Sequence, residues 1–558
     1  MKILRSCVFL LIGLSFLVPN LARAALVPDE QFSLQPPVPV GDEFSGYTRF
    51  VADDSQQLGD WSYLIGLKYK DNDYGKEKLW GQVCKSIEDP QCNGATDFIY
   101  TAVYDVCSKD TDSNCIVSLQ ARIDNGPYIK GVVTERIAPK YDFAFTGNTN
   151  RGVPNGSTPS IWKFPGIKHD GGDEFLLSVK AVKMNVGTGW LYPVDISGGV
   201  QPVSRKSGIF SLPKFTAGKP FNSLGQVWGA DYGKFGNCII VLSEAACALP
   251  WPHPGSISYK LEIRVPKRFD YVNFIHGRLS EPQVSLISVS SLDEIFSIEA
   301  KPISTPFINA WRKNSEISPE LNKTLAEQFR NGGGYEGCSK LERDLCNFVV
   351  PPIQFTDEGL KNYVLWLKEF GDKSTGTKTM WAFKTLSENT MWRVFGSNDC
   401  TEKAESIAGV VATNANIYDS APPFFNKKTN TLDYKVSSPH FDAVGKPNSG
   451  SYDLIISEVV ARCLYGLASA PIKAEVSVIG GESENQIATS SFSSKNGFLV
   501  FTVKGFGYST PVLRIKLSES SSKTVTSNPK KTILCTNGKL TKKVSGTNPK
   551  CPTGYKKK

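Results

Sequence analysis

The best candidate for chemistry in the body of this chain is the octapeptide KHDGGDEF, residues 168–175. Within six residues it holds His169, Asp170, Asp173 and Glu174. Carboxylates at this spacing could give calcium its oxygen ligands, with Asp170, Asp173 and Glu174 as the candidate metal ligands, or could form an acid/base pair. Asp-Gly-Gly-Asp is also well suited to a tight turn between two strands. We expect the turn, with structural calcium as the alternative and no other cofactor.

Two further acidic loops place oxygen-bearing side chains at alternating positions. DTDSN contains Asp110, Asp112 and Asn114, and DNDYG contains Asp71 and Asp73. Neither loop continues with the glycine and the distant glutamate of a calcium-binding loop. We therefore expect both loops to be turns.

The segment FIHGRLSEPQVSL brings His276, Arg278 and Glu281 close together in the chain. These side chains could bind a carboxylate or a sugar. A local ion pair between Arg278 and Glu281 is the simpler interpretation, and it is the one we favour.

Three aromatic residues stand beside turn residues in GTGWLYPVD and LPWPHPGS, namely Trp190, Tyr192 and Trp251. Exposed aromatic rings could stack on a sugar. Aromatic residues more often serve as buried anchors, and we expect that role here.

The C-terminal stretch TILCTNGKLTKKVSGTNPKCPTGYKKK, residues 532–558, has two cysteines, many lysines and no carboxylate side chain. Residues 523–558 hold ten lysines. Without these and the three basic residues of the first 25, the body has 50 Lys and Arg against 54 Asp and Glu, so its net charge is about −4. This segregation of charge favours an anionic envelope polymer or glycan over nucleic acid as the partner, with a solvated solubility tag as the alternative. The candidate envelope-binding residues are Lys539, Lys542, Lys543, Lys550, Lys556, Lys557 and Lys558.

The N-terminus has the pattern of an export signal. Lys2 and Arg5 precede the apolar run 8–18, and Ala-Arg-Ala at 22–24 offers small residues for cleavage, so we expect residues 1–24 to be removed. No later stretch reaches the roughly 18 consecutive apolar residues that a transmembrane helix needs. The expected location is extracellular and associated with the cell wall.

The cysteines also fit an exported chain. Apart from Cys7 in the signal, twelve remain, and most lie close to another cysteine. An even number in an exported chain predicts six disulfides, although the sequence leaves the pairing open. The predicted disulfide cysteines are Cys84, Cys92, Cys107, Cys115, Cys238, Cys247, Cys338, Cys346, Cys400, Cys463, Cys535 and Cys551.

Several enzyme classes lack support in the sequence. It has no G-x-S-x-G elbow, no H-E-x-x-H, no phosphate-binding glycine-lysine loop and no dinucleotide fingerprint. No catalytic residue can be named. A glycosidase that uses two carboxylates stays open, because its paired acids come from distant strands.

The elements that must position these residues are mostly strands. Short runs rich in Val, Ile, Tyr, Phe and Trp alternate with turn residues, as in WSYLIGLKYK, SISYKLEIRV and GFLVFTVKGF. The predicted fold is mainly β, with several antiparallel sandwich-like modules and a small mixed α/β middle region. The expected regions are an N-terminal β-rich region at 25–310, a mixed region at 311–400, a C-terminal β-sandwich-like module at 401–518, a flexible linker at 519–531 and the basic tail at 532–558.

Two segments of the middle region have helical patterns. SPELNKTLAEQFRNGGG offers Ser318 as the N-cap and Pro319 in the first turn. TDEGLKNYVLWLKEFGD places apolar residues on one face and ends at Gly371.

The segments YDLIISEVVARCLYGL and GFLVFTVKGFGYSTPVLRIKLS, followed by the basic tail, resemble the C-terminal ends of large, uncharacterised exported proteins of aquatic actinobacteria. In that group a similar β module precedes a similar lysine-rich tail with a cysteine pair. The resemblance covers about the last 110 residues and implies a location and no chemistry.

These observations predict a secreted, noncatalytic protein associated with the cell wall, with a structural, adhesive or glycan-binding role. The lysine-rich tail would retain it on anionic envelope polymers. The alternative is a secreted carbohydrate-active hydrolase with paired carboxylates.

Overall fold

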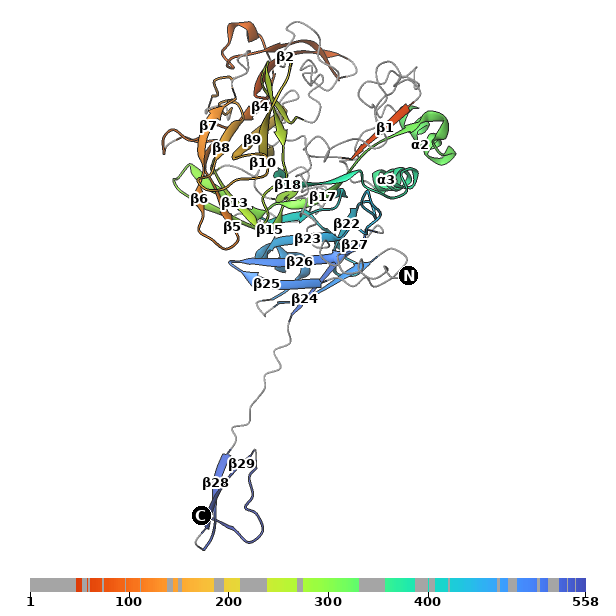
Figure 1. Cartoon of the computed structure of the whole chain (residues 1–558). Helices are drawn as coiled ribbons and strands as arrows, with labels where there is room; N and C mark the ends of the chain where they lie inside the picture. The colour runs from red at the N-terminus through yellow and green to blue at the C-terminus, as the bar shows by residue number, and fades with distance from the viewer. Residues whose placement is uncertain are drawn as a thin grey trace, which may run out of the picture.

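The protein is described from a computed structural model of the chain. The residues that the structure describes are 47–52, 58, 61–72, 75–95, 97–110, 112–137, 144–148, 153–184, 195–210, 238–267, 274–330, 357–386, 400, 407–419, 422–468, 472–479, 489–508, 512–519, 531–538, 540–546 and 548–558. These residues form a mainly β structure of antiparallel sheets and one large mixed sheet, which confirms the predicted fold class (Figure 1).

The large sheet carries most of the described strands. They are β1 (Tyr47–Ala52), β2 (Tyr63–Asn72), β3 (Gly75–Val83), β4 (Asp97–Val103), β7 (Val132–Arg136), β8 (Ser160–Lys163), β9 (Glu174–Met184), β10 (Asp195–Ser207), β11 (Ile240–Ser243), β12 (Ala246–Pro250), β14 (Phe274–Arg278), β17 (Ile303–Lys313), β18 (Gly376–Leu386), β19 (Gly409–Thr413), β23 (Gly450–Ser457), β25 (Thr489–Lys495) and β26 (Phe498–Phe506).

The central path of this sheet runs β3-β2-β4-β9-β10-β18-β14-β19-β23-β26-β25. Neighbours on this path are antiparallel except β14 and β19, which run parallel with Phe274 opposite Gly409. Strands from the predicted N-terminal, middle and C-terminal regions therefore share one sheet.

Two smaller sheets pack against this large one. The first has the order β15 (Ser280–Ser288), β16 (Asp293–Lys301), β13 (Ile257–Pro266), β5 (Cys115–Ile123) and β6 (Ile129–Lys130). The second has the order β20 (Ile417–Tyr418), β22 (Thr431–Ser437), β27 (Val512–Glu519) and β24 (Ile472–Ile479), with β21 (Phe424–Asn426) beside β22.

Alternating side chains explain the packing of β13. Tyr259, Leu261, Ile263 and Val265 are fully buried in the main core, because every second residue of the strand faces the large sheet. Trp381 on β18 meets Tyr259 from the opposite side, with ring centroids 5.9 Å apart. This core joins the large sheet to the smaller sheet that contains β13.

Two of the described α-helices lie where the sequence predicts them. The elements are α2 (Pro319–Arg330), α3 (Asp357–Glu369), α6 (Glu458–Tyr465) and the short turns η3 (Pro90–Cys92) and η6 (Asn314–Glu316). The Ser318 hydroxyl accepts a hydrogen bond from the Leu321 amide at 3.3 Å, as expected of an N-cap. Trp366 of α3 stacks on Phe50 of β1 at 4.9 Å, so α2 and α3 cover β1 and β17 (Figure 1).

Helix α6 lies inside the region that the sequence predicts as strands. It buries Val460, Ala461 and Leu464 in the second core, and Gly466 ends it with a positive φ of 63°. Among the described residues, no helix is long and apolar enough to cross a membrane.

Candidate functional site

The basic tail folds as a small three-stranded antiparallel sheet. Its order is β29 (Leu540–Gly546), β28 (Lys531–Asn537) and β30 (Lys556–Lys557). The disulfide between Cys535 and Cys551 joins the central strand to the segment that leads into β30. Cys535 is fully buried, so the disulfide forms the packed centre of this small sheet.

The described lysine side chains of the tail are exposed to solvent. Those that the structure describes with their side chains are Lys542, Lys543, Lys550, Lys556, Lys557 and Lys558, all exposed. Lys542 also lies over the ring of Tyr555, with its Nζ 5.2 Å from the centroid. Because residues 532–558 contain no Asp or Glu, the sheet is a strongly cationic surface.

The octapeptide around Asp170 is a closed turn. His169 and Gly172 exchange two backbone hydrogen bonds of 2.8 and 3.0 Å. The Gly171 amide donates to His169 Nδ1 at 3.1 Å, and His169 Nε2 lies 3.0 Å from the Glu174 carbonyl oxygen. This arrangement places the imidazole proton on Nε2, and burial lowers the pKa of His169, so the neutral ring locks the turn.

Two of the three carboxylates of this turn have cationic partners. Asp173 Oδ1 is 2.9 Å from Lys163 Nζ, and Glu174 Oε2 is 3.1 Å from Arg205 Nε. Hydrogen bonding to Lys163 lowers the pKa of Asp173. Throughout the described ranges, no group of three His, Cys, Asp or Glu side chains is placed to hold a metal ion, so the calcium alternative gains no support.

Trp251 packs on the same turn and is not an exposed sugar platform. Its indole Nε1 donates to Ser204 Oγ at 2.8 Å, and the side chain is half-buried. A methyl group at Gly171 would overlap the indole, so the glycine is required by the close approach of the ring.

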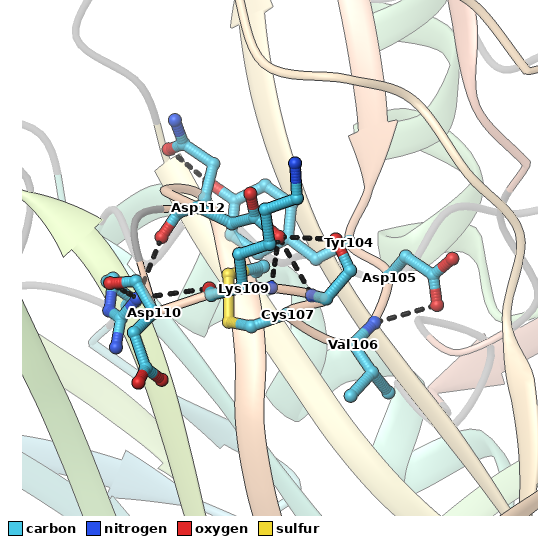
Figure 2. The surroundings of a disulfide bond; sticks show 11 residues. Tyr104, Asp105, Val106, Cys107, Lys109, Asp110 and Asp112 are labelled. Atoms are coloured by element: carbon cyan, nitrogen blue, oxygen red, sulfur yellow. Dashed lines mark hydrogen bonds between the residues drawn. A yellow bond between two sulfur atoms is a disulfide. The ribbon is translucent and has the colours of Figure 1, made fainter.

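The acidic loop 107–115 is closed by a disulfide between Cys107 and Cys115 (Figure 2). Asp112 Oδ2 accepts hydrogen bonds from the Ser108 amide at 2.8 Å, the Ser108 hydroxyl at 2.6 Å and the Lys109 amide at 2.8 Å. These bonds lower the pKa of Asp112, and the bond from the Ser108 hydroxyl has the largest effect. The carboxylate therefore caps the loop as a turn residue.

A buried guanidinium occupies the place where a cation could sit in this loop. Arg264 on β13 donates through Nη1 to the carbonyl oxygens of Lys109 at 3.4 Å and Asp112 at 3.2 Å, and also to that of Asp110. Arg264 is 7% exposed. Since the guanidinium already uses the carbonyls, it serves the loop as an internal cation.

His276 and Arg278 line a pocket of water-molecule size together with Lys384, Met380 and Tyr418. His276 Nδ1 is hydrogen-bonded to the Tyr418 hydroxyl at 2.7 Å. Burial, and then the charges of Lys384 and Arg278, lower the pKa of His276 to about 3. No carboxylate lines this pocket, and the pocket is too small for a sugar.

Arg278 and Glu281 have partners other than those we expected. Arg278 donates to the carbonyl oxygens of Thr413 at 3.1 Å and Asn416 at 3.0 Å, and lies over the Tyr418 ring. Glu281 forms ion pairs with Lys301 at 2.7 Å and Lys504 at 2.8 Å, which lower its pKa to about 2. The arginine organises a loop, and the glutamate links β15 to β16 and β26.

Sequence reasoning missed a polar row on the large sheet. Lys180, Ser197, Lys384 and His276 lie opposite one another in register on β9, β10, β18 and β14. Burial and then the charge of Lys384 lower the pKa of Lys180 to about 7. Lys180 stands in the mostly apolar stretch LLSVKAV, and a charged residue in such a stretch is the signal by which the sequence could have indicated the polar row.

Some predicted residues lie outside the described part of the chain. These are Asp73, Trp190, Tyr192, Cys338, Cys346 and Lys539, most of the predicted linker, and the side chain of Asp71. Disulfides join Cys84 to Cys92, Cys107 to Cys115, Cys238 to Cys247, Cys400 to Cys463 and Cys535 to Cys551. These bonds indicate an oxidising compartment.

No protein-family model matches the chain, and no curated protein sequence matches it either.

Proposed function

We propose that this chain is a secreted, noncatalytic surface protein that its cationic C-terminal sheet retains on anionic polymers of the cell envelope. The observation that carries the proposal is the six exposed lysines of a disulfide-closed segment, residues 532–558, that contains no Asp or Glu. The body has the opposite net charge, about −4. The segment that would attach the protein and the body of the protein therefore carry opposite net charges.

The strength of such attachment follows from the number of lysines. Near a polyanionic surface each lysine contributes on the order of 1 kcal/mol, so the ten lysines of residues 523–558 total several kcal/mol after ordering costs. That corresponds to roughly micromolar retention at low salt. Salt near 1 M shortens the Debye length to about 3 Å and should release the protein.

The candidate sites of the body support a noncatalytic role. Asp173 and Glu174 are engaged with Lys163 and Arg205 around a closed turn, and Asp112 caps a disulfide loop. A carboxylate-based glycosidase needs two carboxyl groups roughly 5 to 10 Å apart that flank a sugar. The described pocket beside His276 has a cationic lining instead.

The test compares the full-length protein with a version that ends at Glu519, the last residue of β27. Both are mixed with isolated cell envelopes across a salt series, and sugar release is measured in the same tubes. We expect the full-length protein to sediment at low salt and the shortened one to stay in solution. Equal sedimentation of both would refute retention by the tail, and released sugar would refute the noncatalytic assignment.

A further inference from the structure

The two lysine pairs of the tail each lie on a β-strand, and this decides where their charges point. Lys542 and Lys543 are consecutive on β29, and Lys556 and Lys557 are consecutive on β30. Consecutive residues of a strand point to opposite faces of the sheet. Each pair therefore places one ammonium group on each face.

The register shows which lysines share a face. Cys535 on the central strand is paired with Lys542 on one side and with Lys557 on the other, so these three side chains point the same way. We call this the cysteine face.

The opposite face carries the other two lysines. Leu534 is paired with Lys543, and Thr536 is paired with Lys556. We call this the leucine face. Each face thus has two exposed lysines from the two outer strands.

This arrangement favours a linear polymer over a flat lipid surface as the partner. A bilayer meets one face of a sheet, and a sheet built for it would gather apolar and basic side chains on that face. Here the exposed leucines are divided as well, with Leu540 on the cysteine face and Leu534 on the leucine face. The two exposed lysines on each face fit two separate anionic strands.

We propose that the tail binds one linear polyanion on each face and so cross-links neighbouring polymer chains of the envelope. This inference rests on the proposed retention of the protein by its tail. The thickness of one sheet layer is about 10 Å, somewhat more than the Debye length of about 8 Å at physiological salt. Polymers on opposite faces are therefore largely screened from one another, and each is attracted to its own lysines.

The experiment uses the full-length protein with two matched variants. One carries Lys542→Gln and Lys557→Gln on the cysteine face, and the other carries Lys543→Gln and Lys556→Gln on the leucine face. The probes are long-chain polyphosphate and polygalacturonate, which separate phosphate from carboxylate chemistry. Binding is measured by fluorescence titration, and cross-linking by light scattering of the polymer at substoichiometric protein. Intact mass and retained disulfides verify the fold of each variant.

We expect the unchanged protein to bind and to raise the scattering of at least one polymer. Each variant should bind about half as much of that polymer per protein at saturation, with an affinity and a salt slope within about twofold of those of the unchanged protein, because the remaining face keeps its own two cationic contacts. Both variants should lose most of the cross-linking, since each keeps one binding face.

The two proposals fail in different ways. If the unchanged protein binds neither polymer at low salt, retention by the tail fails with it. If it binds without raising scattering, or if one face variant binds and cross-links like the unchanged protein, the two-faced arrangement is refuted and one-sided retention stands. Cross-linking by a protein that sediments as a dimer in the absence of polymer would also refute it.

Discussion

Two buried histidines should make the protein sensitive to mild acid. His253 and His276 are both buried, and burial lowers the pKa of each to about 3. His169 adds to the effect at His253, and Lys384 and Arg278 add to it at His276. The unfolded chain binds protons at these positions near pH 6.5, whereas the native protein does not. The part of the stability that depends on these two histidines is therefore complete above about pH 7, and it falls as the pH decreases through 6.5 toward 3.

The size of the loss follows from the two pKa values. With 6.5 in the unfolded state and about 3 in the native state, acidification from pH 7 to pH 5 lowers the free energy of unfolding by about 2 kcal/mol for each histidine. The two together cost about 4 kcal/mol, a large part of the stability of an ordinary domain. Glu281, with its pKa near 2, stays ionised in this range and keeps its ion pairs.

The assay is urea denaturation at pH 7, 6 and 5, followed by tryptophan fluorescence. The substitutions His253→Gln and His276→Gln keep a polar group near the hydroxyls of Tyr259 and Tyr418, which bond to the two rings. We expect each substitution to reduce the difference between pH 7 and pH 5 by about 2 kcal/mol. A pH dependence that is the same in the parent and in both variants would refute the reasoning.

Three other outcomes follow from the described contacts. Arg264→Met should destabilise the protein by at least about 2 kcal/mol and expose the 107–115 loop to proteases, because three carbonyls lose their donor; cleavage no faster than in the parent would contradict this. Replacing Cys400 and Cys463 by Ala should lower the free energy of unfolding by about 4 kcal/mol, whereas removing the local disulfide between Cys107 and Cys115 should lower it by about 2.5 kcal/mol. The first disulfide joins cysteines 63 residues apart and the second joins cysteines 8 residues apart, so the first closes a longer loop. Equal losses in urea denaturation would refute the entropic argument. Gly171→Ala should lower the melting temperature through its overlap with Trp251, and millimolar calcium should leave the parent unchanged; a calcium-induced rise would restore the metal alternative.

Local patterns in the sequence were enough for much of the fold. Strand alternation predicted the β class, and Ser318 and Gly371 marked the ends of two helices because caps depend on a few neighbouring residues. The turn around Asp170 could also be predicted from the sequence, because turn formation depends on neighbouring residues.

Features that depend on distant residues could not be predicted. Helix α6 is eight residues long, and its paired valines favour a strand, so burial of Val460 and Leu464 in the second core must override the local preference. The parallel pairing of β14 with β19 joins parts of the chain that lie far apart, and no local pattern records it. The carbonyl partners of Arg278 are likewise set by that pairing, which brings Thr413 beside β14.

The most direct measurement of the central claim neutralises charge without shortening the chain. Lys542, Lys543, Lys556 and Lys557 are replaced together by Gln, and a matched variant loses four exposed lysines of the body: Lys428, Lys446, Lys473 and Lys516. Co-sedimentation with isolated envelopes is measured at low salt and at 1 M salt. Retention by the tail predicts that the tail variant stays in solution at low salt while the body variant sediments like the parent until salt releases it. Equal loss in both variants, or no loss in the tail variant, would contradict the account.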